Sequence, residues 1–396
     1  MKRWPTKPLG ELCDVEGGNA APQGDHHFQD GTIPFVRMKD LGRRHFTTNL
    51  SDTDDKLTEG SATTNRMKFF EPGCILFPRS GSVALNHRAI LGVRACIVSH
   101  IGVLQNLRPE ITAGYLYLYL TTFDMTALSK KTTGVDSIAF ADVKQIPIPV
   151  APLAEQERIV KLLDEADELR KLRAQADRHT ADLIPALFHE MFVESEDKKN
   201  QWPRTPLASL CSKIVDCPHS TPIYAMSETP YKCVRSSDIQ EGKLDWSSTK
   251  YVDELEYAKR VKVLVPRPGD VVFCREGARL GNAALVTDEK QVCLGQRMML
   301  FRVEPDIATP EFLCAFLLSP VVQKVIWNLV GGSASPHLNV GHTKEFVVAL
   351  PPLPLQKEFA AHVSEIRAMQ AEQSASRRRL DDLFHSLLHR AFQGQL

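Results

Sequence analysis

The sequence has no long hydrophobic run and no excess of charge of either sign. Its 396 residues carry 48 lysines and arginines against 48 aspartates and glutamates, so the formal net charge is +0. No apolar stretch approaches the roughly 18 residues that a membrane helix needs, and the first residues lack the apolar stretch of a signal peptide. Balanced charge also argues against bulk electrostatic binding to nucleic acid, although it permits local basic patches. We therefore expect a soluble, cytoplasmic protein without membrane contacts.

Common catalytic and cofactor-binding motifs are also missing. There is no G-x-x-x-x-G-K-[ST] phosphate loop, no H-E-x-x-H zinc motif and no G-x-G-x-x-G after a predicted strand. The Asn/Asp-Pro-Pro-aromatic tetrapeptide of amino-methyltransferases does not occur either. The nine cysteines are far apart in a long chain, which is typical of reduced thiols rather than of a disulfide framework.

Two weak patterns leave other chemistry open. Asp216 followed by residues 241–243, Glu-Gly-Lys, imitates a nuclease carboxylate set, and Cys211, Cys217 and His219 imitate three metal ligands. The nuclease set is better explained by a turn, and the metal set lacks a fourth ligand. We therefore predict no catalytic residue, no metal and no cofactor in this chain.

The chain consists of two copies of one unit, which is the most informative feature of the sequence. The second copy begins 198 residues after the first, and the offset is 200 near the end of each copy. Matched residues include Trp4/Trp202, Pro8/Pro206, Leu12/Leu210, Arg37/Arg235, Asp40/Asp238, Gly73/Gly269, Arg79/Arg275, Gly81/Gly277, Leu183/Leu383 and Phe192/Phe392. So many matches in one order argue against a chance similarity.

Each copy divides into a mixed segment and a helical segment. Residues 1–150 and 200–350 contain short apolar runs entered through Pro-Gly turns, which predict strands, and one apolar stretch each that predicts a buried helix. Residues 151–199 and 351–396 carry the helical segments. We expect an α+β fold with two mixed domains in tandem and two long helices that separate them.

The helical segments fit a heptad pattern when Ile159 is placed at position a. The apolar a and d residues are then Ile159, Leu162, Ala166, Leu169, Ala176, Leu183 and Leu187 in the first helix, and Phe359, Ile366, Met369, Leu380, Leu383 and Leu387 in the second. At 1.5 Å per residue such helices run roughly 60 Å. A homodimeric coiled coil and an intramolecular antiparallel pair both fit this pattern, and the repeat favours the pair. Pro185 should kink or restart the first helix.

Basic and amide side chains follow one strand in each copy. Arg79 and Arg275 leave a predicted buried strand through a Gly-containing turn, and such a turn should present an arginine to the outside. Arg and Asn make bidentate contacts to guanine and adenine, while Lys and Ser contact phosphates. The candidate DNA-binding residues are Arg37, Arg66, Lys68, Arg79, Ser80, Asn86, His87 and Arg88 in the first copy, and Lys213, His219, Ser220, Arg235, Arg275, Arg279 and Asn282 in the second. Each of them also fits a solvated loop position.

Two segments resemble the specificity subunit of type I restriction-modification systems. Residues 152–159, Pro-Leu-Ala-Glu-Gln-Glu-Arg-Ile, look like the entry to the first spacer helix of that family, and residues 383–396 look like its C-terminal end. The segment 216–222, Asp-Cys-Pro-His-Ser-Thr-Pro, and the openings at Trp4 and Trp202 add to the resemblance. It extends over the whole chain.

The resemblance implies a non-catalytic subunit that reads a split sequence in double-stranded DNA. Residues 1–150 and 200–350 would be target-recognition domains, and residues 151–199 and 351–396 would be antiparallel spacer helices. Two modification (methyltransferase) subunits would dock on the helices, and restriction (motor-nuclease) subunits would join them. S-adenosylmethionine, ATP and Mg²⁺ would then belong to the partners. The chain departs from the pattern where Leu355 replaces Glu155 and where Pro185 stands against His385.

Three rival functions remain at this stage. The chain could serve a fused type II methylase-nuclease, it could modify DNA by itself, or it could be a coiled-coil scaffold with no DNA role. Methyl transfer by the purified chain alone would indicate an enzyme. Failure to bind DNA even with partners present would indicate a scaffold.

Overall fold

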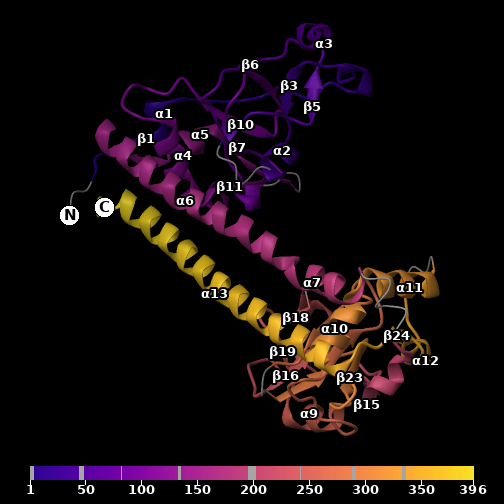
Figure 1. Ribbon diagram of the computed structural model, residues 1–396. Coiled ribbons are helices and arrows are strands. Elements are labelled where there is room, and N and C mark those ends of the chain that lie inside the picture. The colour runs from indigo at the N-terminus through magenta and orange to yellow at the C-terminus, as the bar shows by residue number, and fades with distance from the viewer. Residues whose placement is uncertain are drawn as a thin grey trace. The chain divides into compact units, whose positions relative to one another are not determined.

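The computed structural model describes residues 4–43, 49–81, 83–132, 135–194, 202–240, 242–287, 291–331 and 336–396. The chain forms two compact units (Figure 1). Unit 1 contains residues 1–172 together with 377–396, and unit 2 contains residues 173–376. Each unit therefore combines one mixed domain with parts of both helical segments.

Unit 1 is built on two sheets. The first has the strand order β2-β10-β7-β8-β4 and the second has the order β5-β3-β9-β6. The strands are β1 (Thr6–Pro8), β2 (Asp14–Gly17), β3 (Ile33–Val36), β4 (Asn49–Leu50), β5 (Asp55–Leu57), β6 (Phe69–Phe70), β7 (Ile75–Pro78), β8 (Ala89–Leu91), β9 (Ala95–Ile97), β10 (Ile101–Gln105), β11 (Ser129–Thr132), β12 (Val135–Ile138) and β13 (Pro147–Pro149). Its shorter helices are α1 (Leu9–Leu12), α2 (Met38–Arg43), α3 (Glu59–Thr64), α4 (Ala113–Thr122) and α5 (Phe140–Lys144), with 3₁₀ turns η1 (Asp25–His27), η2 (Val83–Leu85) and η3 (Met125–Leu128).

Unit 2 repeats this topology. Its main sheets have the orders β15-β23-β20-β21 and β19-β16-β22, which correspond to β2-β10-β7-β8 and β5-β3-β9. The strands are β14 (Arg204–Pro206), β15 (Cys211–Asp216), β16 (Tyr231–Val234), β17 (Ile239–Gln240), β18 (Lys243–Leu244), β19 (Lys250–Tyr251), β20 (Val271–Cys274), β21 (Ala283–Leu285), β22 (Gln291–Leu294), β23 (Met298–Val303) and β24 (Val347–Ala349). The helices are α9 (Glu254–Arg260), α10 (Pro310–Leu318), α11 (Pro320–Val330) and α12 (Val340–Lys344), with 3₁₀ turns η4 (Leu207–Leu210) and η5 (Ser236–Asp238). The predicted duplication and the mixed fold are confirmed.

The central strand of each unit is buried on both faces because its side chains alternate between two cores. In β7, Ile75 and Phe77 join the core beneath α4, whereas Leu76 joins the core of the second sheet. Strand β20 does the same with Val271 and Phe273 on one side and Val272 on the other. Side chains alternate along a strand, so an uninterrupted apolar run fits between two cores. This explains why the run after each Pro-Gly turn was recognisable from the sequence.

Two long helical segments follow the mixed domains. One residue, Asp182, separates helix α6 (Leu153–Ala181) from α7 (Leu183–Phe192). Helix α13 (Leu353–Phe392) is one helix of 40 residues (Figure 1). The predicted interruption near Pro185 is confirmed, since proline cannot donate the backbone hydrogen bond that would continue α6. In unit 2, Thr180 contacts Gln373 and Phe188 contacts Phe359, so the two segments run antiparallel there.

The predicted heptad frame is wrong for part of these helices. Leu169, Leu183 and Leu383 are 52%, 38% and 48% exposed, and Met369 is also exposed. The buried face instead follows Gln156, Ile159, Leu163 and Ala166 in α6, and Gln356, Phe359 and Val363 in α13. Ile159 and Phe359 lie at position a of the predicted frame, but they lie at position d of the frame that the buried residues follow. Leu162, Leu187, Ile366, Leu380 and Leu387 are half-buried.

No single helix among the described residues is long and apolar enough to cross a membrane. The bent pair α10 and α11, which meet at 56°, passes that test of length and composition when the two are taken together.

Candidate nucleic-acid interface

The turn that follows the central strand has the same backbone geometry in both units. In unit 1 the Arg79 N–H donates to the carbonyl of His100 at 2.9 Å, and the Arg79 carbonyl accepts from the N–H of Ile138 at 2.9 Å. Gly81, with φ of +83°, donates to the Asp136 carbonyl at 3.0 Å. A positive φ favours glycine, because a Cβ atom would be strained there. These bonds fix where the Arg79 side chain starts.

Unit 2 reproduces each of these bonds. The Arg275 N–H donates to the Arg297 carbonyl at 2.9 Å, and the Arg275 carbonyl accepts from the N–H of Leu338 at 2.9 Å. Gly277 has φ of +82° and donates to the Pro336 carbonyl at 2.9 Å. The repeated strand-turn-arginine motif is therefore one structural element built twice.

The two arginine side chains nevertheless have different surroundings. Arg79 is partly exposed, and its guanidinium carbon lies 4.4 Å from the ring centre of Phe140. Next to it, the Ser80 hydroxyl is 2.7 Å from Nδ1 of His100. This arrangement holds the cation by its flat face and leaves its edge available for a ligand.

Arg275 is only 2% exposed and lies among acidic and histidine side chains. Its Nε donates to Asp216 at 2.8 Å, its Nη1 is 3.0 Å from Glu276, and the His337 ring lies within 3.3 Å of the same nitrogen. The expectation that this turn presents an arginine to the outside is therefore wrong for Arg275. The carboxylates neutralise it inside the unit.

One residue of β2, which pairs with β10, differs from its counterpart in β15, which pairs with β23, and this accounts for the difference. Gly17 pairs with Gly102 in β10, and Asp216 pairs with Met299 at the corresponding place in β23. A Cβ added to Gly17 would lie 3.1 Å from the Phe140 ring and 3.7 Å from Arg79, so a side chain at this position would press on the packed pair. Asp216 carries a carboxylate there and binds the arginine instead.

Loop 217–220 is held close to Arg275. His219 is 3.3 Å from Asp216 through Nε2, and its side chain is 76% exposed. The buried Arg260 of α9 donates to the Ser220 carbonyl at 2.7 Å and pairs with Glu256 at 2.6 Å. His219, Ser220 and, on β15, Lys213 are thus exposed on a loop and strand that buried residues hold in place.

Arg88 is a structural residue and does not face solvent. It is 2% exposed and donates to the carbonyl of Asn86 at 3.0 Å, to the side chain of Asn86 at 2.7 Å and to the carbonyl of Phe123 at 3.1 Å. Burial lowers the pKa of Arg88 to about 10, and the arginine stays charged at neutral pH. Asn86 has φ of +51°, so Arg88 stabilises an unusual backbone conformation. The prediction that Arg88 is exposed is wrong.

Some of the remaining candidates pair with acidic side chains of their own unit, and others are exposed or half-buried. Arg37 pairs with Asp55, and Arg235 pairs with the buried Asp238 at 2.6 Å, so both act inside their units. Arg66 is exposed, and Lys68 is 2.6 Å from Glu16. Arg279 is exposed and donates to the Ile239 carbonyl at 3.1 Å, whereas His87 and Asn282 are half-buried.

The described part of the chain contains no group of three His, Cys, Asp or Glu side chains that could hold a metal ion. Burial raises the pKa of Cys211 to about 12 and also raises the pKa of Cys217, so both thiols keep their protons. Metal binding requires the thiolate. Glu241, which completes the alternative nuclease pattern, lies outside the described residues.

Sequence comparison decides the family. The model of the type I restriction modification DNA specificity domain matches residues 1–177 and again residues 226–375. The chain belongs to this family. It is a type I restriction-modification specificity subunit, whose role is DNA recognition.

Relatives of this specificity subunit carry the same description. The type I restriction enzyme EcoBI specificity subunit of Escherichia coli is 28% identical, with 99% of this chain and 86% of that protein covered. The MjaIX specificity subunit of Methanocaldococcus jannaschii is 20% identical over 92% of this chain and 87% of its own length.

Two solved structures share the fold. The S subunit from M. genitalium is 15% identical and covers 98% of this chain and 96% of its own, with a TM-score of 0.56. A chain from a study of complex assembly and conformational transition of the type I R-M system is 19% identical, covers 100% and 99%, and has a TM-score of 0.63.

A buried glutamine near the start of each long helix was missed in the sequence of this specificity subunit. Gln156 is 0% exposed; its Nε2 donates to the carbonyls of Glu110 and Ala151 at 2.8 Å, and its Oε1 accepts from the Thr112 N–H at 2.9 Å. Gln356 forms the corresponding bonds to Ile307, Pro351 and Thr309. The recurrence of Pro-Leu followed by Gln at an offset of 200 was the available signal.

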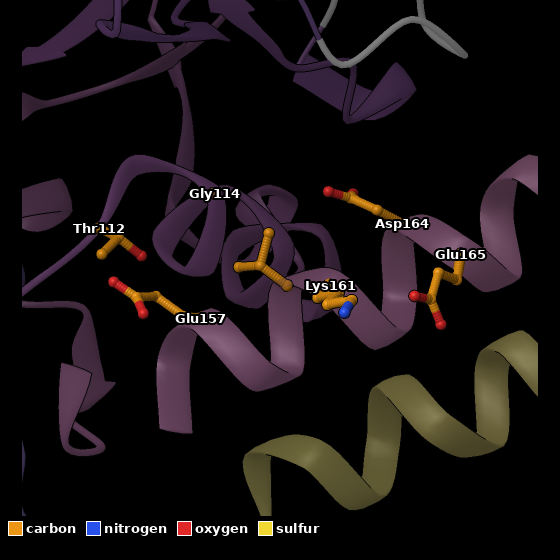
Figure 2. Close-up of a pocket in the computed structure, with 7 residues that line it drawn as sticks. Thr112, Gly114, Glu157, Lys161, Asp164 and Glu165 are labelled. Carbon is orange, nitrogen blue, oxygen red and sulfur yellow. The ribbon is translucent and has the colours of Figure 1, made fainter. Parts of the chain in front are cut away.

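A shallow hollow of about 430 Å³ lies in unit 1 where α6 passes the start of α4. Figure 2 shows Glu157, Lys161, Asp164 and Glu165 projecting from α6, with Thr112 at the start of α4. Burial and the charge of Asp167 raise the pKa of Asp164. The hollow is open and mostly acidic, which suits a contact with a cationic surface better than one with DNA.

Proposed function

We propose that this chain reads a bipartite DNA target, with residues 1–150 reading one half and residues 200–350 the other. Residues 151–199 and 351–396 would be spacer helices that set the distance between the halves. The chain itself would carry out no reaction. Two modification subunits would supply S-adenosylmethionine-dependent methylation. The restriction subunits would add ATP- and Mg²⁺-dependent translocation and cleavage.

The duplicated strand-turn-arginine motif is the observation that carries this proposal. Two copies with matching backbone bonds imply two reading elements of one kind. Their side chains differ, since Arg79 rests on Phe140 and Arg275 is neutralised by Asp216. Elements with one backbone and different side chains suit the recognition of two different base sequences.

Exposed or half-buried cations and polar groups of the described residues are the proposed DNA contacts. In the first copy these are Arg66, Lys68, Arg79, Ser80 and His87, and in the second Lys213, His219, Ser220, Arg279 and Asn282. Arg37, Arg88, Arg235 and Arg275 would act as positioning residues, because carboxylates or carbonyls of their own unit occupy them. Asn86, which Arg88 holds, would orient His87.

The outward faces of the long helices are the proposed docking surface for modification subunits. Leu169, Leu183 and Leu383 are exposed there although they belong to long helices. Exposed leucines on the surface of a helix suit packing against a partner helix. Ile159, Phe359 and the half-buried Leu162, Leu187, Ile366, Leu380 and Leu387 would support that surface from behind.

Exchange of one recognition domain tests the bipartite reading. Residues 1–150 would be replaced by those of a relative with another target, and the variant would be expressed with its modification and restriction subunits. Methylome sequencing should show a change in one half of the methylated motif only. A change in both halves would contradict the proposal, and methyl transfer by the purified chain alone would show that it is an enzyme. If the host genome encodes a fused methylase-nuclease as the sole partner, the type II assignment replaces the type I partners.

A further inference from the structure

A second cavity lies in unit 2, and Asn282 is among the residues that line it. It measures about 520 Å³ and lies beside the break between α6 and α7, enclosed by α7, α10, the start of α11 and α13. Its apolar lining includes Ile184, Phe188, Cys314, Ala315, Leu318 and Val363. Cavities of roughly 300–1,000 Å³ with mostly apolar walls and a few polar groups are typical small-molecule sites.

The two copies differ in several side chains at the positions that line this cavity. The N-terminal caps Thr112 and Thr309 align α4 with α10, so Tyr117 corresponds to Cys314 and Leu118 corresponds to Ala315. The offset of 200 in the long helices makes Phe384 the counterpart of Ile184. Unit 2 thus has the smaller side chain at these three positions, whereas at Phe188, whose counterpart is Leu388, it has the larger one.

In unit 1 the corresponding positions carry aromatic rings. Tyr117 is buried, and Phe384 is half-buried with the Arg170 guanidinium carbon 4.5 Å from its ring centre. Such a cation–π contact is favourable. Unit 1 therefore shows what this part of the repeat accommodates, namely an aromatic ring next to a guanidinium group.

Asp182, His189, Lys243, Asn282 and Glu311 line the cavity, and two further polar side chains, Arg367 and Gln370, lie about one helix turn apart on α13. Nε2 of Gln370 donates to the Thr180 carbonyl at 2.7 Å, and Oε1 of Gln370 has no hydrogen-bond partner among the described residues. Arg367 reaches only the Gly242 carbonyl, at 3.5 Å, and within the described chain its Nε has no partner. Buried groups of this kind destabilise the folded protein when they are unpaired. One is an acceptor and the other is a donor.

We propose that this cavity binds a small aromatic molecule with a polar substituent that both donates and accepts hydrogen bonds, such as a phenol. The ring occupies the volume that Tyr117 and Phe384 fill in unit 1. The substituent accepts from Arg367 and donates to Gln370 after a small side-chain adjustment. The bound molecule joins α7, α10 and α13 and so stabilises unit 2.

Fluorine NMR with 4-fluorophenol tests this proposal on the full chain. The ligand signal should broaden and shift in a saturable way, and the melting temperature should rise with ligand concentration. Cyclohexanol should bind about tenfold more weakly, because it has a hydroxyl but no aromatic ring to face the arginine. Arg367→Met should weaken binding of 4-fluorophenol more than binding of fluorobenzene.

Filling the cavity provides the decisive variant. Ile184→Phe restores the residue of unit 1 and should weaken 4-fluorophenol binding by about tenfold or more, while the volume-matched Ile184→Leu should retain it. Ala315→Leu fills the cavity from α10 and replaces Ile184→Phe if that variant does not fold, as judged by circular dichroism. Absence of saturable binding to the wild-type chain, or equal binding to a folded filled variant, would overturn the proposal. Neither result bears on DNA recognition, which the methylome reports separately.

Discussion

At the scale of single residues, the same position of the repeat has two roles. Arg79 and Arg275 leave equivalent strands and share their backbone bonds, but Gly17 in one unit and Asp216 in the other direct the side chains differently. The sequence revealed the repeated arginines because they follow the same Pro-Gly strand. It did not reveal that Arg275 is neutralised, because Asp216 is 59 residues away in the chain.

Arg79→Ala should weaken specific DNA binding while the fold is retained. Loss of a base-contacting arginine costs about 1–3 kcal/mol of discrimination, and a partly exposed side chain contributes little to the core. Fluorescence anisotropy of the complex with its modification subunits, on cognate and altered duplexes, measures this. Arg94→Ala is the control, since Arg94 pairs with Glu71 at 3.0 Å on the surface. Equal affinities of Arg79→Ala and wild type would remove Arg79 from the interface.

Arg275→Ala should instead destabilise unit 2. The variant leaves the carboxylates of Asp216 and Glu276, which are 27% and 26% exposed, without their cation. Breaking a buried pair costs about 3–5 kcal/mol, and partial exposure places the expected loss near the lower limit. Chemical denaturation measures it, with Arg279→Ala as the exposed control. An unchanged free energy of unfolding would show that the ion pairs contribute nothing net.

Buried thiols should make the protein sensitive to alkaline pH. Burial raises the pKa of Cys13 and of Cys211 from 9.0 to about 12. Between these values the unfolded chain loses the proton that the folded chain keeps, so the free energy of unfolding falls as pH rises above 9 and is unaffected below it. Urea denaturation at pH 8 and pH 10 checks the sign. Cys13→Ala should reduce the difference in the free energy of unfolding between pH 8 and pH 10. An unaltered difference would contradict the contribution of Cys13.

At the scale of elements, the long helices show the limit of counting leucines. The predicted heptad frame places apolar residues at positions a and d. The buried face, however, contains Arg170, which pairs with Asp381 at 2.7 Å, and Thr180, which contacts Gln373 at 2.8 Å. Polar residues are tolerated there because each has a partner on α13. Those partners are about 200 residues away, so the sequence pattern alone could not rank the two frames.

Gln156→Ala and Gln356→Ala should each lower stability. Each glutamine satisfies two carbonyls and one N–H, and its removal leaves buried polar groups unpaired at about 1–3 kcal/mol in total. Lys161→Ala and Lys357→Ala, on the exposed sides of the same helices, are matched controls. Differential scanning calorimetry should show one unit melting earlier in each variant. Equal melting of variant and control would show that water replaces the glutamine fully.

At the scale of the whole molecule, the repeat made most of the architecture predictable. The strand-rich segments, the helix after each of them and the interruption near Pro185 are all confirmed. The compact units were not foreseen, because residues 377–396 join the N-terminal unit through contacts such as that between Tyr115 and Phe392, whose ring centres are 5.1 Å apart. Sequence adjacency gives no sign of such long-range packing.

Inserting four residues after Arg173 should lengthen the unread gap between the two half-sites. Four residues add roughly 6 Å to the helix, and this length equals almost two base pairs at about 3.4 Å each. Four residues also nearly complete one helical turn, so the rest of the helix keeps its orientation. Methylome sequencing should show unchanged half-sites with a longer gap. A two-residue insertion turns the helix by roughly 200° and should abolish assembly or folding. An active four-residue variant with an unchanged gap would refute the spacer role.

The membership of residues 377–396 in unit 1 has a consequence for synthesis on the ribosome. Leu388 and Ala391 belong to the same core as Tyr115 and Ile159, so the N-terminal unit lacks part of its core until nearly the entire chain has been translated. Unit 2 is contiguous and needs only residues 173–376. The second unit can therefore complete its core before the first, which reverses the usual order in which the N-terminal part of a protein folds first.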